Sequence, residues 1–281
     1  MTEHDEKVFG LIKHGGAIAS SATGSILGLL TGGPIGAVLG GAVGAALDSV
    51  IDELAERELS RREKVRVGGT AAYAIDFVRE RLKRGDVPRE DGFFVKGESG
   101  SSPAEEIFDG VLVKAKSDHE ERKARFYGRL FANVAFDPEC SRAEANYLLH
   151  LMDGLTFLQL ALVSLFSNAS DFPQLPTDDY ERKPIHFELL NSLAATFELY
   201  QNGILRLRKP GDKSGEVILD IGEIRPAHMT LSATGKRLFE LAGLAAIGES
   251  SDLQTLADLL ASTASITGAV VLEKEALLRN K

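Results

Sequence analysis

Six glycines recur at every fourth position near the start of this chain, and what they can do is bring backbones into close contact. They are Gly24, Gly28, Gly32, Gly36, Gly40 and Gly44. On a helix this spacing places a stripe without side chains along one face. Small-residue stripes let membrane helices approach one another closely. The stripe lies in residues 14–47, which contain no Asp, Glu, Lys or Arg. We therefore interpret the six glycines as a self-association site.

The uncharged run is too long for one straight membrane span. A continuous helix over residues 14–47 would be about 51 Å long, whereas the hydrocarbon core of a bilayer is about 30 Å thick. Gly33 and Pro34 interrupt the run, because a Gly-Gly-Pro sequence resists a continuous helix. We predict a helical hairpin with arms over residues 15–30 and 35–51, and with Gly33 and Pro34 as its hinge. Each arm is short, so insertion would require tilting or a locally thinner bilayer.

Basic residues flank the uncharged run on both sides and predict its orientation. They are Lys7 and Lys13 before the run, and Arg57, Arg61, Arg62, Lys64 and Arg66 after it. By the positive-inside rule, both flanks lie in the cytoplasm. We expect the protein at the cytoplasmic face of the inner membrane, or in the cytoplasm until a trigger acts. A tightly packed soluble hairpin is the alternative that the residues leave open.

Composition limits the class of protein and its partners. The chain has 281 residues, of which 44% are hydrophobic and 26% charged, so most of it should fold as a soluble protein. Its net charge of −9 does not favour nucleic acid as a partner. Cys140 is the single cysteine, which excludes an internal disulfide and a cysteine-based zinc cluster. The acidic start of the chain is unlike that of a secretory signal peptide.

No reaction motif is present in the sequence. It contains neither a GxxxxGK[ST] phosphate loop nor a GxSxG nucleophile elbow. No two histidines stand three or four residues apart, as a metal site on one helix requires; the six are His4, His14, His119, His150, His186 and His228. We predict no catalytic residue, no metal site and no cofactor. The expected protein is therefore not an enzyme, although a site assembled in space would leave no such motif.

The segment after the uncharged run reads as helix and then loop. Residues 48–84 have the apolar spacing of one long amphipathic helix, or of two, with a kink at Gly68 and Gly69. Gly85 should end this helix. Residues 86–101 are polar and rich in glycine, and predict a mobile loop that holds the short apolar sequence Phe93-Phe94-Val95.

Capping sequences then mark the starts of further helices. Ser102, Ser141 and Thr156 are each followed three residues later by Glu or Gln, as in a capping box. The predicted helices cover residues 103–117, 119–135, 142–152 and 157–167. On the second of these, one apolar face should belong to the core, and it consists of Phe126, Leu130, Phe131 and Val134.

The C-terminal third has the element order of a winged-helix module. We predict a helix over residues 186–201 that stops at Asn202 and Gly203, strands over 204–208 and 216–221, and a helix over 233–246. Two more helices should cover residues 252–260 and 265–278. DNA-reading helices present Arg or Lys to bases and phosphates. Residues 186–200 contain neither, which argues against sequence-specific DNA binding.

The predicted fold class is therefore mainly α, in five parts. Residues 1–51 form the glycine-zipper hairpin, and residues 52–101 form an amphipathic helical connector and a loop. Residues 102–167 form a helical domain. Residues 168–250 form the winged-helix-like module with a small β-wing, and residues 251–281 form the C-terminal helices.

Three stretches resemble the bacterial abortive-infection alpha family. The first is residues 121–133, which end in Leu130-Phe131-Ala132-Asn133; the second is residues 147–156; the third combines residues 200–205 with residues 231–238. Ser232 stands where the family usually has threonine, and Asn202 stands where it usually has leucine. The resemblance covers less than half of the chain and leaves the glycine stripe outside it.

The resemblance implies a role in phage defence, through growth arrest or death of the infected cell, and it carries over no catalytic residue. We interpret the chain as a membrane-associated, self-assembling effector that perturbs or anchors to the inner membrane. The expected partners are further copies of the chain, membrane lipid and a protein trigger, but not nucleic acid. The alternative is a soluble winged-helix adaptor or transcription-associated regulator that oligomerises through its hairpin.

Overall fold

The computed structural model describes residues 59–97, 101–181, 183–208, 218, 220–248, 251–262 and 270–271. These residues form eight α-helices and two short two-stranded antiparallel sheets, which confirms the mainly α fold class with a small β element. The predicted hairpin over residues 1–51 lies outside the described residues. The described residues up to Leu155, with Leu241–Gly243, form one compact unit, and the others form a second. The division into five parts stays a prediction.

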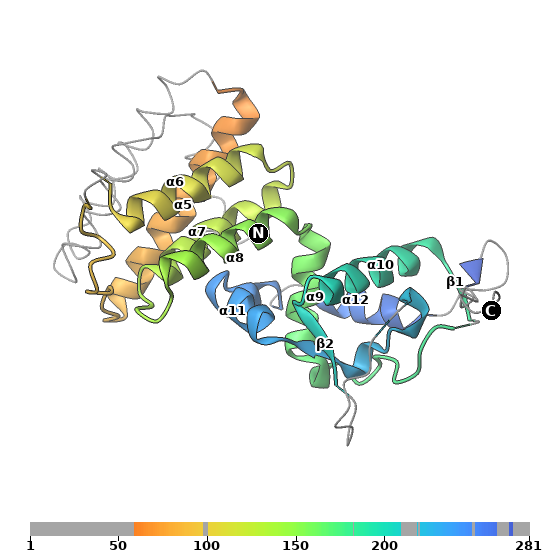
Figure 1. Cartoon of the computed structure of the whole chain (residues 1–281). Coiled ribbons are helices and arrows are strands. Elements are labelled where there is room, and N and C mark those ends of the chain that lie inside the picture. Colours follow the sequence, from red (N-terminus) through yellow and green to blue (C-terminus); the bar gives the residue numbers. More distant parts are fainter. Residues whose placement is uncertain are drawn as a thin grey trace, which may run out of the picture. The chain divides into compact units, whose positions relative to one another are not determined.

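Unit 1 is a bundle of four helices, drawn in orange to green in Figure 1. They are α5 (Arg61–Lys83), α6 (Pro103–Ser117), α7 (Ala124–Val134) and α8 (Arg142–Gly154). Helix α5 packs against α6 and α7, and α6 also packs against α8. The predicted apolar face of α7 is confirmed as core, and the Phe131 ring lies 4.7 Å from that of Phe108 between centroids.

Capping residues fix where several helices begin. The boxes predicted at Ser102 and Thr156 are confirmed, and the side chain of Ser141 accepts the Glu144 N–H. The helix predicted over residues 119–135 instead begins as a 3-10 turn at Glu121–Lys123 and becomes helical at Ala124. The reason is local, because the carboxylate of Asp118 accepts the Glu120 N–H and holds the chain in a turn before the helix.

Helix α5 continues as one α-helix through Gly68 and Gly69, so the alternative of two helices divided at these residues is wrong, while the kink there stays a prediction. Gly128 of α7 lies against the backbone of α5. A methyl group at position 128 would lie 2.7 Å from both the Ala74 nitrogen and the Thr70 carbonyl oxygen. The two helices therefore touch backbone to backbone, a contact that larger side chains would prevent. The part of the predicted helix before Leu59 lies outside the described residues.

Replacing Gly128 with Ala should lower the free energy of unfolding by about 2 kcal/mol or more, because the added methyl overlaps backbone atoms that cannot rotate away. Chemical denaturation of the full chain measures this change. Gly154→Ala is the matched control, since nothing lies within 4 Å of a Cβ there. Equal stability of the two variants would contradict the close contact between α5 and α7.

The loop after α5 is anchored by Arg89 over part of its length, rather than mobile as predicted. The Arg89 side chain is only 4% exposed, and its guanidinium donates to the carbonyl oxygens of Cys140 (2.7 Å) and Val134 (3.3 Å). It also pairs with Asp91 and stacks on the buried ring of Phe93, 4.4 Å from its centroid. A buried, fully engaged arginine of this kind holds residues 89–93 against the bundle.

Unit 2 is organised around α9 (Phe157–Ser167), a helix that is apolar on all sides and buried along almost its whole length. It packs against α10 (Phe187–Gln201) and α12 (Asp252–Ala261), and also against the 3-10 turn Leu244–Ile247. These helices are drawn in green to blue in Figure 1, together with α11 (Ala233–Leu241). The predicted bounds of α9 are confirmed, and those of α10 agree to one residue.

The strands of unit 2 pair differently from the prediction. Strand β2 (Leu205–Leu207) is confirmed, and its antiparallel partner is β3 (Met229–Leu231). In the strand predicted over 216–221, the described residues 218, 220 and 221 are not in a strand. Of that segment, Ile221 begins a 3-10 turn; residues 209–217, which include the predicted turn at 210–215, lie outside the described residues. The pair confirms a small β element, while the assignment as a winged helix stays a prediction.

Two C-terminal helix predictions are corrected. The helix predicted over 233–246 ends at Leu241, because Gly243 adopts a positive φ of 63° that stops it. The helix predicted over 265–278 is wrong at Val270–Val271, which form strand β4 and pair with β1 (Pro184–Ile185). Both residues of β4 are β-branched and suit a strand. Residues 263–269 and 272–281 lie outside the described residues.

Ser232 fastens the start of α11 to the end of α10. Its hydroxyl donates to the Gly203 carbonyl (2.6 Å) and accepts the Gly235 N–H (3.0 Å), while its own N–H donates to the Ile204 carbonyl (3.0 Å). Gly203 has a positive φ of 69°, which confirms the predicted stop of the preceding helix. Gly235 leaves no room for a Cβ, which would lie 2.2 Å from the Ile204 oxygen.

The Ser232 hydroxyl makes a testable contribution to stability. Ser232→Ala should reduce the free energy of unfolding by about 1–2 kcal/mol, since the cap of α11 and the bond to Gly203 are lost together. Ser232→Thr keeps the hydroxyl and should remain close to the wild-type value. Thermal unfolding compares the three proteins, and a stable alanine variant would show that the hydroxyl contributes little.

Candidate functional site

The residues predicted to self-associate lie outside the described residues. They are Gly24, Gly28, Gly32, Gly36, Gly40 and Gly44, with the predicted hinge residues Gly33 and Pro34. The structure does describe the place where the chain that follows them enters unit 1. This place is the N-terminal end of α5, where the polypeptide meets the end of α6 and the start of α7.

Helix α5 starts afresh at Ser60. The Ser60 hydroxyl accepts the Glu63 N–H (3.3 Å), and the Glu63 carboxylate accepts the Ser60 N–H (2.7 Å). These hydrogen bonds from Ser60 lower the pKa of Glu63, so its carboxylate is ionised at neutral pH. Ser60 itself is extended, with ψ near 158°. Because a capped residue of this kind breaks the helical path, α5 is not a continuation of any helix before it.

The first turns of α5 carry a concentration of positive charge. Arg61 and Arg62 are exposed at its first two positions, and Lys64 and Arg66 follow with half-buried side chains. The N-terminal end of a helix carries partial positive charge of its own, which makes cations there unfavourable. Glu63 is the only acidic residue in the first turn.

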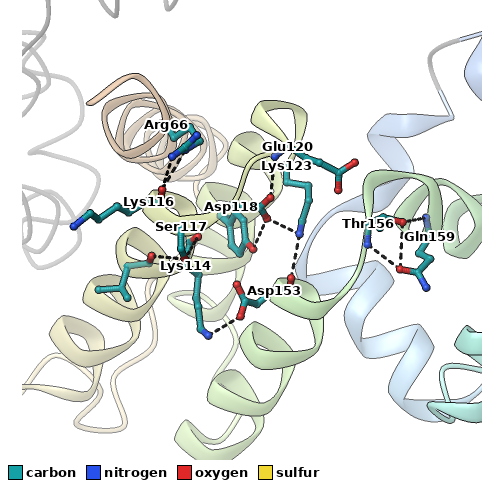
Figure 2. A network of polar contacts seen from close by, with 12 residues as sticks. Arg66, Lys114, Lys116, Ser117, Asp118, Glu120, Lys123, Asp153, Thr156 and Gln159 are labelled. Carbon is teal, nitrogen blue, oxygen red and sulfur yellow. Dashed lines mark hydrogen bonds and ion pairs between the residues drawn. The ribbon is translucent and has the colours of Figure 1, made fainter. Parts of the chain in front are cut away.

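Helix α6 brings a further cation to the same end of the bundle. The Arg66 guanidinium donates to the Lys116 carbonyl oxygen at 2.7 and 3.2 Å, a contact visible in Figure 2. The ammonium of Lys116 lies 3.8 Å from the Glu63 carboxylate and stays about half exposed. We call Arg61, Arg62, Lys64, Arg66 and Lys116 the basic rim.

A buried ion pair lies at the junction of α6 and α7. The Lys123 ammonium is 2.5 Å from the Asp118 carboxylate, and their side chains are only 2% and 7% exposed. Asp118 also accepts the Tyr127 hydroxyl (2.9 Å) and the Glu120 N–H (2.9 Å). Lys123 reaches on to the Asp153 carbonyl at the end of α8 (3.4 Å), as Figure 2 shows. The network ties together the ends of three helices.

The electrostatics of this network keep Asp118 charged. Burial by itself raises the pKa of Asp118, but hydrogen bonds from Lys123 and from the Glu120 N–H, together with the Lys123 charge, lower it overall. Burial raises the pKa of Tyr127, and the neighbouring Asp118 charge raises it further, so Tyr127 remains a proton donor. An ionised carboxylate paired with a cation and a phenol that stays protonated make a structural junction.

Lys123→Met should therefore destabilise the protein by about 3–5 kcal/mol, because it leaves the buried Asp118 carboxylate without its cation. Lys114→Met is the control. Lys114 pairs with Asp153 at 2.6 Å, but both side chains are about one-third exposed, and such a pair contributes less than about 1 kcal/mol. Urea unfolding of both variants at neutral pH makes the comparison. A Lys123 variant no less stable than the Lys114 variant would contradict the role of the buried pair.

The buried pair of Asp118 and Lys123 also predicts how the free energy of unfolding depends on pH. A carboxyl whose pKa is lower in the folded state stabilises that state above its unfolded pKa of about 3.9, and this stabilisation disappears as the pH falls through the folded value. The wild-type free energy of unfolding should fall more steeply below about pH 4 than that of Asp118→Asn. Equal slopes for the two proteins would show that Asp118 does not titrate as inferred.

Within the described part of the chain, no three His, Cys, Asp or Glu side chains gather where they would hold a metal ion. No single helix among the described ones is long and apolar enough to cross a membrane; only α8 and α9, taken together across the bend that separates them, reach the required length and hydropathy. Most of α9 is buried in the core of unit 2.

A family model described as the co-chaperone DjlA transmembrane domain matches residues 20–72. The matched segment includes all six stripe glycines, both hinge residues and the first turns of α5, and it indicates that this is a membrane-associated protein. No curated protein matches the chain, and no solved structure matches it either.

The structure divides the matched segment. Its last residues belong to α5, where Val67, Gly69 and Ala72 are buried inside unit 1. Residues packed in this way belong to the folded body of unit 1, whose N-terminal end in the described chain is the start of α5. The Ser60 to Glu63 capping box, which marks this end, has the Ser-x-x-Glu spacing that sequence analysis could have used. The position of Lys116 beside Glu63 left no such signal, because the two residues are far apart in the chain.

Proposed function

We propose that this chain is a non-enzymatic, membrane-anchored protein that assembles with copies of itself through its glycine stripe, while units 1 and 2 remain at the cytoplasmic face. The observation that carries this proposal is a coincidence of position. The family model of a transmembrane domain matches a segment that holds most of the charge-free run and all six regularly spaced glycines. Small-residue stripes drive close helix packing in lipid.

The arrangement of the described residues supports an anchor that is separate from the body of the protein. Unit 1 packs its own core from α5 onward, and its first helix has its own cap at Ser60. Arg61 and Arg62, in the last part of the matched segment, follow the uncharged run and are exposed at the start of α5. The positive-inside rule favours a cytoplasmic position for this flank.

A role in phage defence is the finer part of the proposal, and it rests on the resemblance to the abortive-infection alpha family. In unit 1 the resembling residues have structural roles. Phe126 and Leu130 lie in the core, and Asn133 donates to the Leu241 carbonyl (2.9 Å). We envisage that a protein trigger shifts the chain towards an assembled state that perturbs the inner membrane. Such a trigger has to bind the assembled state more tightly than the resting state.

Bulky residues on the stripe test self-association. Gly28→Leu combined with Gly36→Leu should abolish assembly and toxicity, because side chains on the stripe keep neighbouring helices apart. The control, Ala22→Leu with Ala42→Leu, adds leucines in the same uncharged run, but two positions away from the stripe. Crosslinking in membranes measures assembly, growth after induction measures toxicity, and the thermal unfolding of units 1 and 2 should be unchanged.

Two outcomes would contradict the proposal. Normal assembly of the stripe variant would show that the six glycines do not form the contact. Full-length protein that washes off membranes and forms a soluble dimer able to retard DNA would favour the alternative of a winged-helix regulator. The absence of Lys and Arg from residues 187–201 of α10 speaks against that alternative.

A further inference from the structure

We propose that the basic rim is a binding surface for the headgroups of anionic phospholipids, which it holds against the N-terminal end of α5. This inference rests on the proposed membrane anchor and adds to it a lipid class and the residues that recognise it. The rim consists of Arg61, Arg62, Lys64, Arg66 and Lys116, from two helices.

The first argument is that Arg61 and Arg62 lie at the N-terminal end of a helix, where positive charge is unfavourable. Both guanidinium groups are exposed, and in the described part of the chain no hydrogen bond or ion pair joins either of them to another residue. They stand at the positive end of the α5 dipole, where cations destabilise a helix. A bound anion reverses this effect, because the phosphate interacts favourably with both guanidinium groups and with the helix end.

The second argument is that the rim is constructed by tertiary contacts. The Arg66 guanidinium binds the last turn of α6 through the Lys116 carbonyl, which fixes the Lys116 ammonium beside the start of α5. Two carboxylates at this end of unit 1 are already engaged. Glu63 caps Ser60 and approaches Lys116, and Asp118 is buried against Lys123. Neither of these two described carboxylates pairs with Arg61 or Arg62, so both arginines can interact with an external anion.

The third argument concerns which anion. The four rim residues on α5 lie in the last part of the segment matched by the transmembrane-domain model, residues 20–72, and they follow the uncharged run that ends at Leu47. With that run anchored in the bilayer as proposed, the start of α5 is held near the lipid headgroups. Phosphodiesters of anionic lipids are the anions concentrated there. Nucleic acid, the other abundant phosphodiester, is disfavoured by the net charge of −9.

Vesicle binding of the full chain tests the proposal. Partitioning is measured into phosphatidylcholine vesicles and into vesicles of equal parts phosphatidylcholine and phosphatidylglycerol. The wild type should prefer the anionic vesicles, and R61Q/R62Q should reduce this preference roughly 30-fold, at about fivefold for each basic residue near an anionic surface. The control is K83Q/R84Q, which removes two exposed cations at the other end of α5 and should keep the preference.

Additional measurements separate lipid binding from folding. R61Q/R62Q should unfold at the wild-type temperature or above it, since it removes cations from the positive end of a helix. Lys116→Gln, on another helix, should lower the preference about fivefold. Added salt should weaken the preference of the wild type, because exposed charges are screened.

The possible failures are distinguishable. Equal binding to both kinds of vesicle, or an R61Q/R62Q protein that keeps its anionic preference, would overturn the assignment of the basic rim and leave the anchor intact. A full chain that binds neither kind of vesicle would instead overturn the proposed membrane anchor.

Discussion

The contact on which unit 1 depends is the approach of α5 to α7 without intervening side chains. Gly128 lies directly over the backbone at Thr70 and Ala74, and the two helices share the core through this crossing. Because α5 is held so closely, its first turn has a defined place in the bundle, next to the end of α6. Backbone contact through small residues thus occurs among the described helices, and it is the same kind of contact that the glycine stripe predicts for neighbouring copies.

At this end of unit 1, the buried charges are paired with each other, whereas two arginines on the surface are exposed. Inside the bundle, Lys123 and Asp118 neutralise one another, and Tyr127 completes the network. On the surface, Arg61 and Arg62 remain exposed at a helix end that repels them. A buried charge without a partner would destabilise the fold severely. Exposed cations cost little in water and are available to a membrane surface. This contrast fits the proposal that the start of α5 stands at the boundary between a membrane anchor and a folded body.

In unit 2, the local sequence pattern predicts a strand correctly but does not predict which segment pairs with it. The sequence from Leu205 to Leu207 predicts a strand, and the order of the elements suggests residues 216–221 as the next one. Met229–Leu231 is the partner, and Ser232 next to it binds the end of α10 at the same time. Strand β3 pairs with β2, and Ser232, which follows β3, caps α11. The strand pair and the cap therefore satisfy backbone hydrogen-bonding groups in the same place. The small sheet follows from this combination of contacts.

The sequence alone determined the features that depend on neighbours within a few residues. These are the capped starts at Ser102 and Thr156, the αL stop at Gly203, the apolar core face of α7, and the uncharged glycine-rich run that the transmembrane-domain model also matches. Tertiary structure decided what depends on residues distant in the chain: the close approach of α5 to Gly128, the burial of Arg89 and the position of Lys116 in the basic rim. The physical reason is that caps and periodicity act through hydrogen bonds and burial within one element. Close packing and ion pairing instead require groups that only the folded chain brings together.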